Sequence, residues 1–340
     1  MIVGNYELKR CIGIGYFGEI YLGNSKNENN IYSIERIDRE KIEKDKSFQY
    51  LNNDFKFLKL LNHPNIIKLI ETVKTRNHYY MVKEYFNGGS LASELERYII
   101  KNGKTFSEKI IQYLMNQIID AIKYIHENKI IVRHINIENI FLHYDNEEDR
   151  QNLNLMKAKI KFTEFCFAIK NKNAINLNCN NILNDDTETI IMRDLKTSKQ
   201  HELTVGKKSY YDIRSIGEIC FKIIFRKLNK DIYKSDLNDY SEIINDSFSD
   251  TLMISQELIS FMNSMMICKE FKRPSASKLS KHDFLTKEIN QLNKIYLKYD
   301  SEIKINLEQE DFLREYLENH IITPLDIEIN KLSITLFQKN

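Results

Sequence analysis

The chain has 340 residues, enough for a substantial core and more than one simple domain needs, so we expect two lobes or domains. Its 50 basic and 48 acidic side chains nearly cancel, which gives no support to a nucleic-acid binder. The five cysteines lack metal-site spacing, and no apolar run approaches a membrane span. We therefore expect a cytoplasmic protein with reduced thiols, no metal site and no membrane contact. The Asn-, Lys- and Ile-rich composition we interpret as compositional drift.

The first segment predicts two strands joined by a glycine-rich turn. Residues 6–14 and 19–23 alternate apolar and polar side chains, and the turn between them carries Gly13, Gly15 and Gly18. Glycine allows the backbone to approach phosphates closely, with its amides as donors. A plain hairpin turn is the alternative explanation of the same spacing.

A further strand, a helix and another strand follow. Residues 31–38 read as a strand that carries Ser33 and Glu35, and 46–62 as a helix with one apolar stripe. The run Leu61-Asn-His-Pro-Asn-Ile-Ile leads to a strand near residues 78–84. The glycines of the following Gly88-Gly89-Ser90 mark the change to helical patterns.

The next segment predicts a long helix and then an irregular loop. Apolar residues from Ile110 to Ile125 share one helical face, with Ser107 as the expected N-cap. His126, at the end of this helix, is expected to pack rather than to bind a ligand. Residues 130–142 read IIVRHINIENIFL, and residues 159–168 read KIKFTEFCFA.

These segments resemble the protein kinase family in order and spacing over residues 5–285. The resemblance implies an α+β bilobal kinase fold, with an N-lobe at 1–86 and a C-lobe at 87–285. The activation segment would run from 164 to 202. Residues 286–340 form a C-terminal extension, with helical patterns near 287–299 and 309–321.

The resemblance also implies an ATP cleft. The positions that would surround a nucleotide are the glycine-rich loop and its flanks, the strand residue against adenine, the hinge that joins the lobes, and the cleft floor. They are Ile12, Gly13, Gly15, Gly18, Ile20, Ser33, Glu84, Phe86, Asn139 and Phe141.

The catalytic positions depart from the family pattern. Glu35 replaces the phosphate-binding lysine, Asp54 the glutamate that pairs with it, and His134 the catalytic aspartate. Asn136 replaces a lysine of the catalytic loop, and Glu164 and Cys166 replace Asp and Gly of the DFG motif. Taken alone, Asp54 is better explained as a solvated helix charge. Glu164 keeps an oxygen ligand, but ordinary two-metal catalysis is not expected.

One further departure suggests an ion pair. Lys83 stands at the gatekeeper position, where kinases usually carry an apolar residue, and a buried lysine is costly without a partner. We expect it to pair with Glu35, Asp54 or both. The alternative is a small register slip that leaves Lys83 at the surface.

The remaining matches imply structural roles. Leu58, Leu69, Val132 and Phe165 would form the apolar stack between the lobes, and Glu202 and Arg273 a buried C-lobe ion pair. Asp212 opens a buried helix. Arg133 would be the partner of a phosphorylated activation segment, whose candidate acceptors are Thr187, Thr189, Thr197 and Ser198.

The sequence therefore predicts a degenerate protein kinase, or pseudokinase, with little or no phosphotransfer and a regulatory or scaffold protein as its partner. ATP is a candidate ligand, with magnesium binding weakly or not at all. Two alternatives stay open. One is an atypical transferase that uses Lys83, His134 and Glu164; the other is a structural module whose cleft is closed by Phe141 and the acidic cluster.

Overall fold

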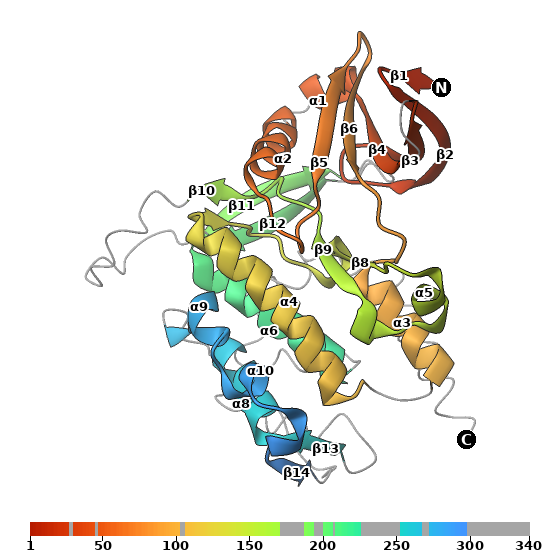
Figure 1. Ribbon diagram of the computed structural model, residues 1–340. Coiled ribbons are helices and arrows are strands. Elements are labelled where there is room, and N and C mark those ends of the chain that lie inside the picture. Colours follow the sequence, from red (N-terminus) through yellow and green to blue (C-terminus); the bar gives the residue numbers. More distant parts are fainter. Residues whose placement is uncertain are drawn as a thin grey trace.

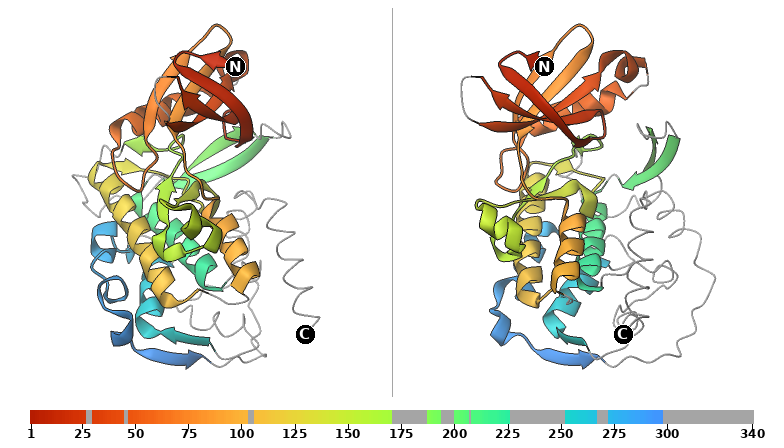
Figure 2. Two further views of the ribbon diagram at one scale, coloured as in Figure 1. Left: turned by 45° about the vertical axis from the view of Figure 1, so that its right-hand side comes forward. Right: turned by 90° about the vertical axis from the view of Figure 1, so that its right-hand side faces the viewer.

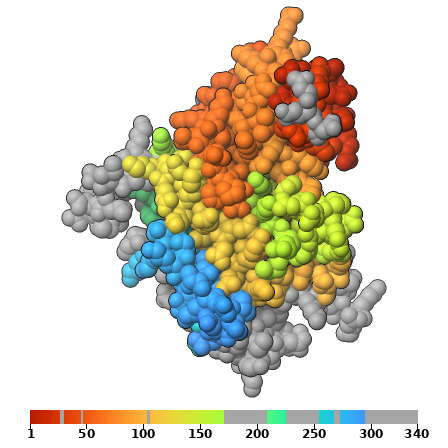
Figure 3. Space-filling view, viewed as in Figure 1, coloured from red at the N-terminus to blue at the C-terminus, as the bar shows by residue number. Residues whose placement is uncertain are grey.

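The computed structural model describes residues 1–26, 30–44, 47–102, 106–170, 187–193, 200–206, 208–225, 252–266 and 272–297. These residues form a sheet-containing upper lobe and a helical lower lobe (Figure 1). The space-filling view shows the upper lobe stacked directly on the lower one (Figure 3). This is the predicted bilobal α+β architecture.

The N-lobe is built on a six-stranded antiparallel sheet of order β1-β2-β3-β4-β6-β5. Its strands are β1 (Ile2–Val3), β2 (Tyr6–Ile14), β3 (Glu19–Ser25), β4 (Ile31–Asp38), β5 (Leu69–Lys74) and β6 (His78–Glu84). Helices α1 (Arg39–Lys44) and α2 (Phe48–Leu60) connect β4 to β5. Strand β6 is almost entirely buried because apolar clusters cover both faces of the sheet.

The C-lobe is organised around α4 (Glu108–Glu127), whose apolar stripe is buried as its periodicity predicted. Ser107 is the N-cap residue, although its side chain makes no capping hydrogen bond. The other helices are α3 (Leu91–Asn102), α5 (Glu147–Asn152), α6 (Ser209–Phe225), α8 (Gln256–Met266), α9 (Ala276–Leu279) and α10 (Asp283–Thr286).

Short strands and 3₁₀ turns connect these helices. They are β7 (Ile130–Ile131), η1 (Ile137–Asn139), β8 (Ile140–His143), η2 (Leu155–Lys157), β9 (Lys159–Phe162) and β10 (Ile169–Lys170). Strand β8 pairs with β9, and β10 pairs with β7. In the activation segment, β11 (Thr187–Arg193) and β12 (Gln200–Gly206) form a hairpin, which the two views of Figure 2 place beside the junction of the lobes.

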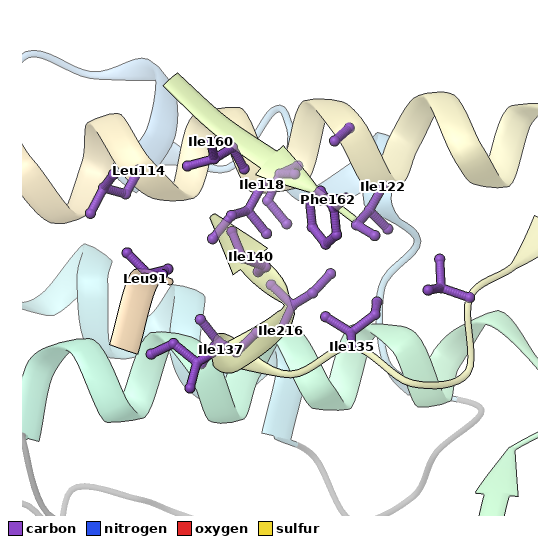
Figure 4. Packing of buried hydrophobic residues seen from close by; sticks show 14 of the residues in the cluster. Leu91, Leu114, Ile118, Ile122, Ile135, Ile137, Ile140, Ile160, Phe162 and Ile216 are labelled. Carbon is purple, nitrogen blue, oxygen red and sulfur yellow. The ribbon is translucent and has the colours of Figure 1, made fainter. Parts of the chain in front are cut away.

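The loop at residues 132–139 rests on the C-lobe core. Ile135, Ile137 and Ile140 point between α4 and α6 and pack with their apolar side chains (Figure 4). This packing holds the loop in place through its alternate apolar residues, so its polar residues are carried by a rigid support.

The predicted helix near residues 287–299 is wrong over its described part. This segment contains a 3₁₀ turn, η5 (Ile289–Gln291), and strand β14 (Lys294–Leu297), which pairs antiparallel with β13 (Leu252–Ser255). The backbone N–H and C=O groups of β14 form their hydrogen bonds with a strand distant in sequence. Local periodicity of the side chains does not reveal such a pairing. The pattern at 309–321 lies outside the described residues.

Within the described ranges, no helix combines the length and apolar character needed to cross a membrane.

Candidate functional site

The most unusual feature of the cleft between the lobes is a buried ion pair. Glu35 on β4 and Lys83 on β6 are both buried, and Lys83 Nζ lies 2.8 Å from Glu35 Oε2. Lys83 stands opposite Ser33 in the β4–β6 register, so Glu35 is its diagonal neighbour on the same face. The ion pair expected from the sequence is therefore formed, and Lys83 is not at the surface.

The second oxygen of Glu35 binds the glycine-rich loop. The backbone N–H of Phe17, at the tip of this loop, donates to Glu35 Oε1 at 3.1 Å. One carboxylate thus joins the loop to the gatekeeper lysine. Backbone amides of such a loop are donors suited to phosphate oxygens; here one of them donates its hydrogen bond to Glu35 instead.

The glycines of the loop allow it to lie directly on β4. A Cβ atom added at Gly18 would overlap the carbonyl oxygen of Arg36, and one at Gly15 would lie 2.6 Å from Glu35 Oε1. Gly13, by contrast, has open space around it. Close packing against backbone therefore requires glycine at position 18, whereas a Cβ at position 15 would meet side-chain atoms of Glu35 and Ile20.

An aromatic cluster fills the space beneath the loop. Phe17 is buried and packs edge-on against Tyr16, with ring centroids 4.8 Å apart. Phe167 lies at the centre of the cluster, with its ring 5.5 Å from Tyr16, 5.2 Å from Tyr50 and 5.4 Å from His134. Sequence reasoning missed Tyr16, Tyr50 and Phe167, because only the folded chain brings together rings so far apart along it.

Asp54 on α2 is buried beside this ion pair, so its interpretation as a solvated helix charge is wrong. Its Oδ1 accepts the backbone N–H of Phe165 at 2.7 Å. Burial raises the pKa of Asp54 to about 7, against the opposing effects of Lys83 and this hydrogen bond. Asp54 therefore connects α2 to the segment that replaces DFG.

The charge of Lys83 is maintained by its acidic neighbours. Burial acts against the charged form, but Glu35 and then Asp54 hold the pKa of Lys83 above its usual value. Glu164 contributes in the same direction. One ammonium group thus faces three carboxyl groups in the same part of the cleft.

Glu164, which replaces the DFG aspartate, and Asn139, a predicted nucleotide-binding residue, do come together. Asn139 Nδ2 donates to Glu164 Oε2 at 2.8 Å and lies 3.3 Å from Nδ1 of His134. Although Glu164 keeps some exposed surface, its carboxylate is enclosed by protein, which raises its pKa to about 8, and Asp54 and Glu35 add to the rise. Cys166 is buried, and burial raises the pKa of its thiol. Across the described ranges, no three His, Cys, Asp or Glu side chains are grouped so that they could hold a metal ion.

Asn136 and Arg133 make local contacts within the loop. The side chain of Asn136 accepts the backbone N–H of Glu138 and caps η1. Arg133 is buried, has a φ of 71°, and donates from Nε to the Phe167 carbonyl at 2.5 Å. The predicted contact of Arg133 with a phosphorylated residue stays a prediction; Thr197 and Ser198 lie outside the described residues.

Asp212 anchors the same loop from α6. Its two carboxylate oxygens accept the backbone N–H groups of Val132 at 2.9 Å and Arg133 at 2.8 Å. Nε2 of His126 lies 2.9 Å from Asp212 Oδ2. His126 is therefore a hydrogen-bonding residue, not simply the packing residue expected, and no sequence periodicity pairs it with a residue 86 positions away.

The hinge presents mainly apolar and backbone groups. The Phe86 and Phe141 rings are 4.6 Å apart, and Ser33 Oγ donates to the Glu84 carbonyl at 3.1 Å. The Glu84 side chain pairs with Lys161 at 2.8 Å. Ile20 is partly buried, whereas Ile12 is 40% exposed.

The apolar stack between the lobes is also assembled. Leu58, Val132 and Phe165 belong to one buried cluster, and Leu69 packs against it. The Glu202–Arg273 ion pair stays a prediction, because Glu202 lies in β12, where the structure describes the backbone alone. Arg273 donates to the Tyr210 carbonyl at 3.3 Å.

Comparison with known proteins agrees with this architecture. Residues 6–285 match the protein kinase domain. The chain is 34% identical to CBL-interacting protein kinase 21 of Oryza sativa subsp. japonica over 142 residues, 42% of this chain and 26% of that protein. It is 33% identical to calcium-dependent protein kinase 4 of Plasmodium berghei over 150 residues, 44% of this chain and 28% of that protein.

The chain thus spans less than a third of the length of these curated relatives. The domain match, however, covers most of the chain and includes both lobes described above. The chain belongs to the protein kinase family.

Proposed function

We propose that this domain is a pseudokinase, a regulatory or scaffolding module with little or no phosphotransfer. The observation that carries the proposal is the position of Glu35. A carboxylate stands where kinases use a lysine to neutralise the ATP phosphates, and it is held there by Lys83 and the loop amide of Phe17.

Membership in the protein kinase family implies ATP use, typically with magnesium. ATP would supply the phosphoryl group, and the protein would supply positive charge, metal ligands and a base. Here Lys83 is committed to Glu35, and Glu164 has its pKa raised to about 8. A carboxyl group that is largely protonated at neutral pH is a poor magnesium ligand, which supports weak or absent magnesium binding.

His134, at the position of the catalytic aspartate, also favours little or no phosphotransfer. His134 could act as a base near neutral pH, but it lacks the carboxylate's negative charge toward an incoming hydroxyl. Its Nδ1 faces the Asn139 amide, and its ring packs edge-on against Phe167. These contacts suit a residue that holds the loop in position.

The packing framework of a kinase is nonetheless kept. The Asp212 anchor and the apolar stack both join distant parts of the chain. A rigid domain without phosphotransfer can still present a surface to a protein partner, and we propose such a partner, with the cytoplasm as the compartment.

The convergence of Asn139 and Glu164 favours a second candidate, an atypical kinase with rearranged ligands. A third, the closed structural module, is favoured by the aromatic cluster under the loop. Of the three candidates, only the atypical kinase requires measurable transfer of phosphate from ATP.

Transfer of labelled phosphate from ATP to the protein itself and to a general substrate tests the proposal. We expect none beyond that of the Asn139→Ala variant, prepared in parallel to reveal contaminating kinases. Transfer that is present in the natural chain and lost in Asn139→Ala, with magnesium or manganese, would overturn the proposal in favour of the second candidate.

A further inference from the structure

Glu35 occupies the place of a phosphate in this cleft. Its Oε1 accepts the Phe17 amide at 3.1 Å, and its Oε2 accepts from Lys83 at 2.8 Å. A backbone amide of the glycine-rich loop and a lysine ammonium are the two kinds of donor that hold ATP phosphates in kinases. The protein's own carboxylate therefore satisfies both.

A phosphate cannot simply be added beside this carboxylate. The loop lies on β4 so closely that a Cβ atom at Gly15 would be 2.6 Å from Glu35 Oε1, and Gly18 rests on the Arg36 backbone. Phe17 is buried under the loop tip. An anion could reach the amide only by displacing Glu35 and opening this packing.

Displacement is opposed by charge. Glu35 is buried and would have to leave the ammonium of Lys83, and Asp54 and Glu164 lie close enough to interact with it electrostatically. An entering phosphate would thus meet the Glu35 carboxylate in the place it must occupy, beside an ammonium that is already paired. Repulsion between like charges is strong at such sites because little water screens it.

The hinge end of the same cleft lacks this obstacle. Within the described residues, the backbone amide and carbonyl of Phe86 make no hydrogen bond, so both are available to a ligand. The Phe86 ring packs against Phe141 here, with ring centroids 4.6 Å apart, and the small, uncharged Ser33 is hydrogen-bonded to the Glu84 carbonyl. A flat heterocycle with a donor and an acceptor on one edge fits these groups.

We infer that Glu35 makes the cleft selective for uncharged, nucleoside-type ligands, because it takes the place of their phosphates at the loop. This inference rests on the proposed function in one respect, that the cleft need not present phosphate for transfer. It goes beyond that proposal by naming the ligand class and the residue that sets it.

Isothermal titration of the full chain with adenosine, AMP, ADP and ATP, in excess chelator, tests the inference. We expect adenosine to bind and the affinity to fall along the series, by at least about tenfold between adenosine and ATP. Adding magnesium should not restore ATP binding to the level of adenosine. This part of the test needs no variant.

Two variants then identify the responsible residue. Glu35→Gln removes the charge and keeps one of the two acceptor oxygens, so it should bring ATP affinity to that of adenosine or above. Glu19→Gln, on the adjacent strand, removes the same charge from a partly exposed residue that pairs with Arg36. It should leave the order of affinities unchanged.

ATP binding tighter than adenosine in the natural chain would overturn the inference, as would failure of adenosine to bind. An unchanged ligand order in folded Glu35→Gln would exclude Glu35 as the determinant and also overturn it. None of these outcomes bears on phosphotransfer, which the labelled-phosphate assay measures separately, so the two proposals can fail independently.

Discussion

Lys83 Nζ and Glu35 Oε2 lie 2.8 Å apart on neighbouring strands of the N-lobe sheet, with both side chains buried. This relationship reverses the sign of charge at the phosphate-binding position of a kinase. It also makes each residue dependent on the other, because a buried charge without a partner is strongly unfavourable.

Lys83→Met should therefore destabilise the domain by about 3–5 kcal/mol, because it leaves Glu35 buried without its cation. Urea unfolding measures the change, and Glu35→Gln combined with Lys83→Met should recover part of it. Lys44→Met, which breaks an exposed ion pair with Glu40, is the control and should have little effect. Unchanged or increased stability in Lys83→Met would rule out a stabilising role for the pair.

Glu35→Lys should not restore phosphotransfer. The substitution returns the family's residue to one position, but His134, Asn136, Glu164 and Cys166 remain, and the new lysine faces Lys83. We expect the labelled-phosphate assay to stay at background and the thermal unfolding temperature to fall. Robust phosphorylation by this single variant would contradict the pseudokinase proposal.

Stability should fall as the pH rises from about 5 to about 8. The pKa is raised to about 7 for Asp54 and about 8 for Glu164, so in this range the folded state holds protons that the unfolded state has released. Because the folded state binds more protons than the unfolded state in this range, raising the pH favours the unfolded chain. Urea unfolding at several pH values measures the slope, and Glu164→Gln with Asp54→Asn should flatten it.

Gly18→Ala should destabilise the N-lobe, whereas Gly13→Ala should not. The new methyl group at position 18 would overlap the Arg36 carbonyl, while position 13 has open space. Overpacking of this kind typically costs about 1–3 kcal/mol. The two variants form a matched pair from one loop, and equal thermal unfolding temperatures would show that the loop does not lie on β4.

Asp212→Ala should loosen the loop at residues 132–139. It leaves the buried amides of Val132 and Arg133 without an acceptor, at about 1–3 kcal/mol for each amide. Hydrogen exchange at these amides should accelerate, and urea unfolding should shift to lower concentration. Asp283→Ala, an exposed residue that pairs with Lys287, is the control. Exchange as slow as in the natural chain would exclude this anchoring role.

The resemblance of the sequence to protein kinases was sufficient to predict the bilobal fold and to identify the unusual charged residues at positions 35 and 83. Apolar spacing along α4 and the strands reports which faces are buried, and neighbouring antiparallel strands bring the residues of one face together. The Lys83–Glu35 pair could be foreseen because both residues stand on one face of the sheet and a buried lysine needs a partner.

The tertiary structure alone decided how the cleft is filled. Phe17 could have pointed away from β4, since a glycine-rich turn permits many backbone paths; it is the packing of Tyr16, Tyr50 and Phe167 that favours the closed one. The contacts of Asp54 with the Phe165 amide, of His126 with Asp212 and of β14 with β13 likewise join segments distant in sequence. Local periodicity reports which face of a segment is buried, whereas these contacts depend on which distant group meets that face, and only the assembled lobes determine that.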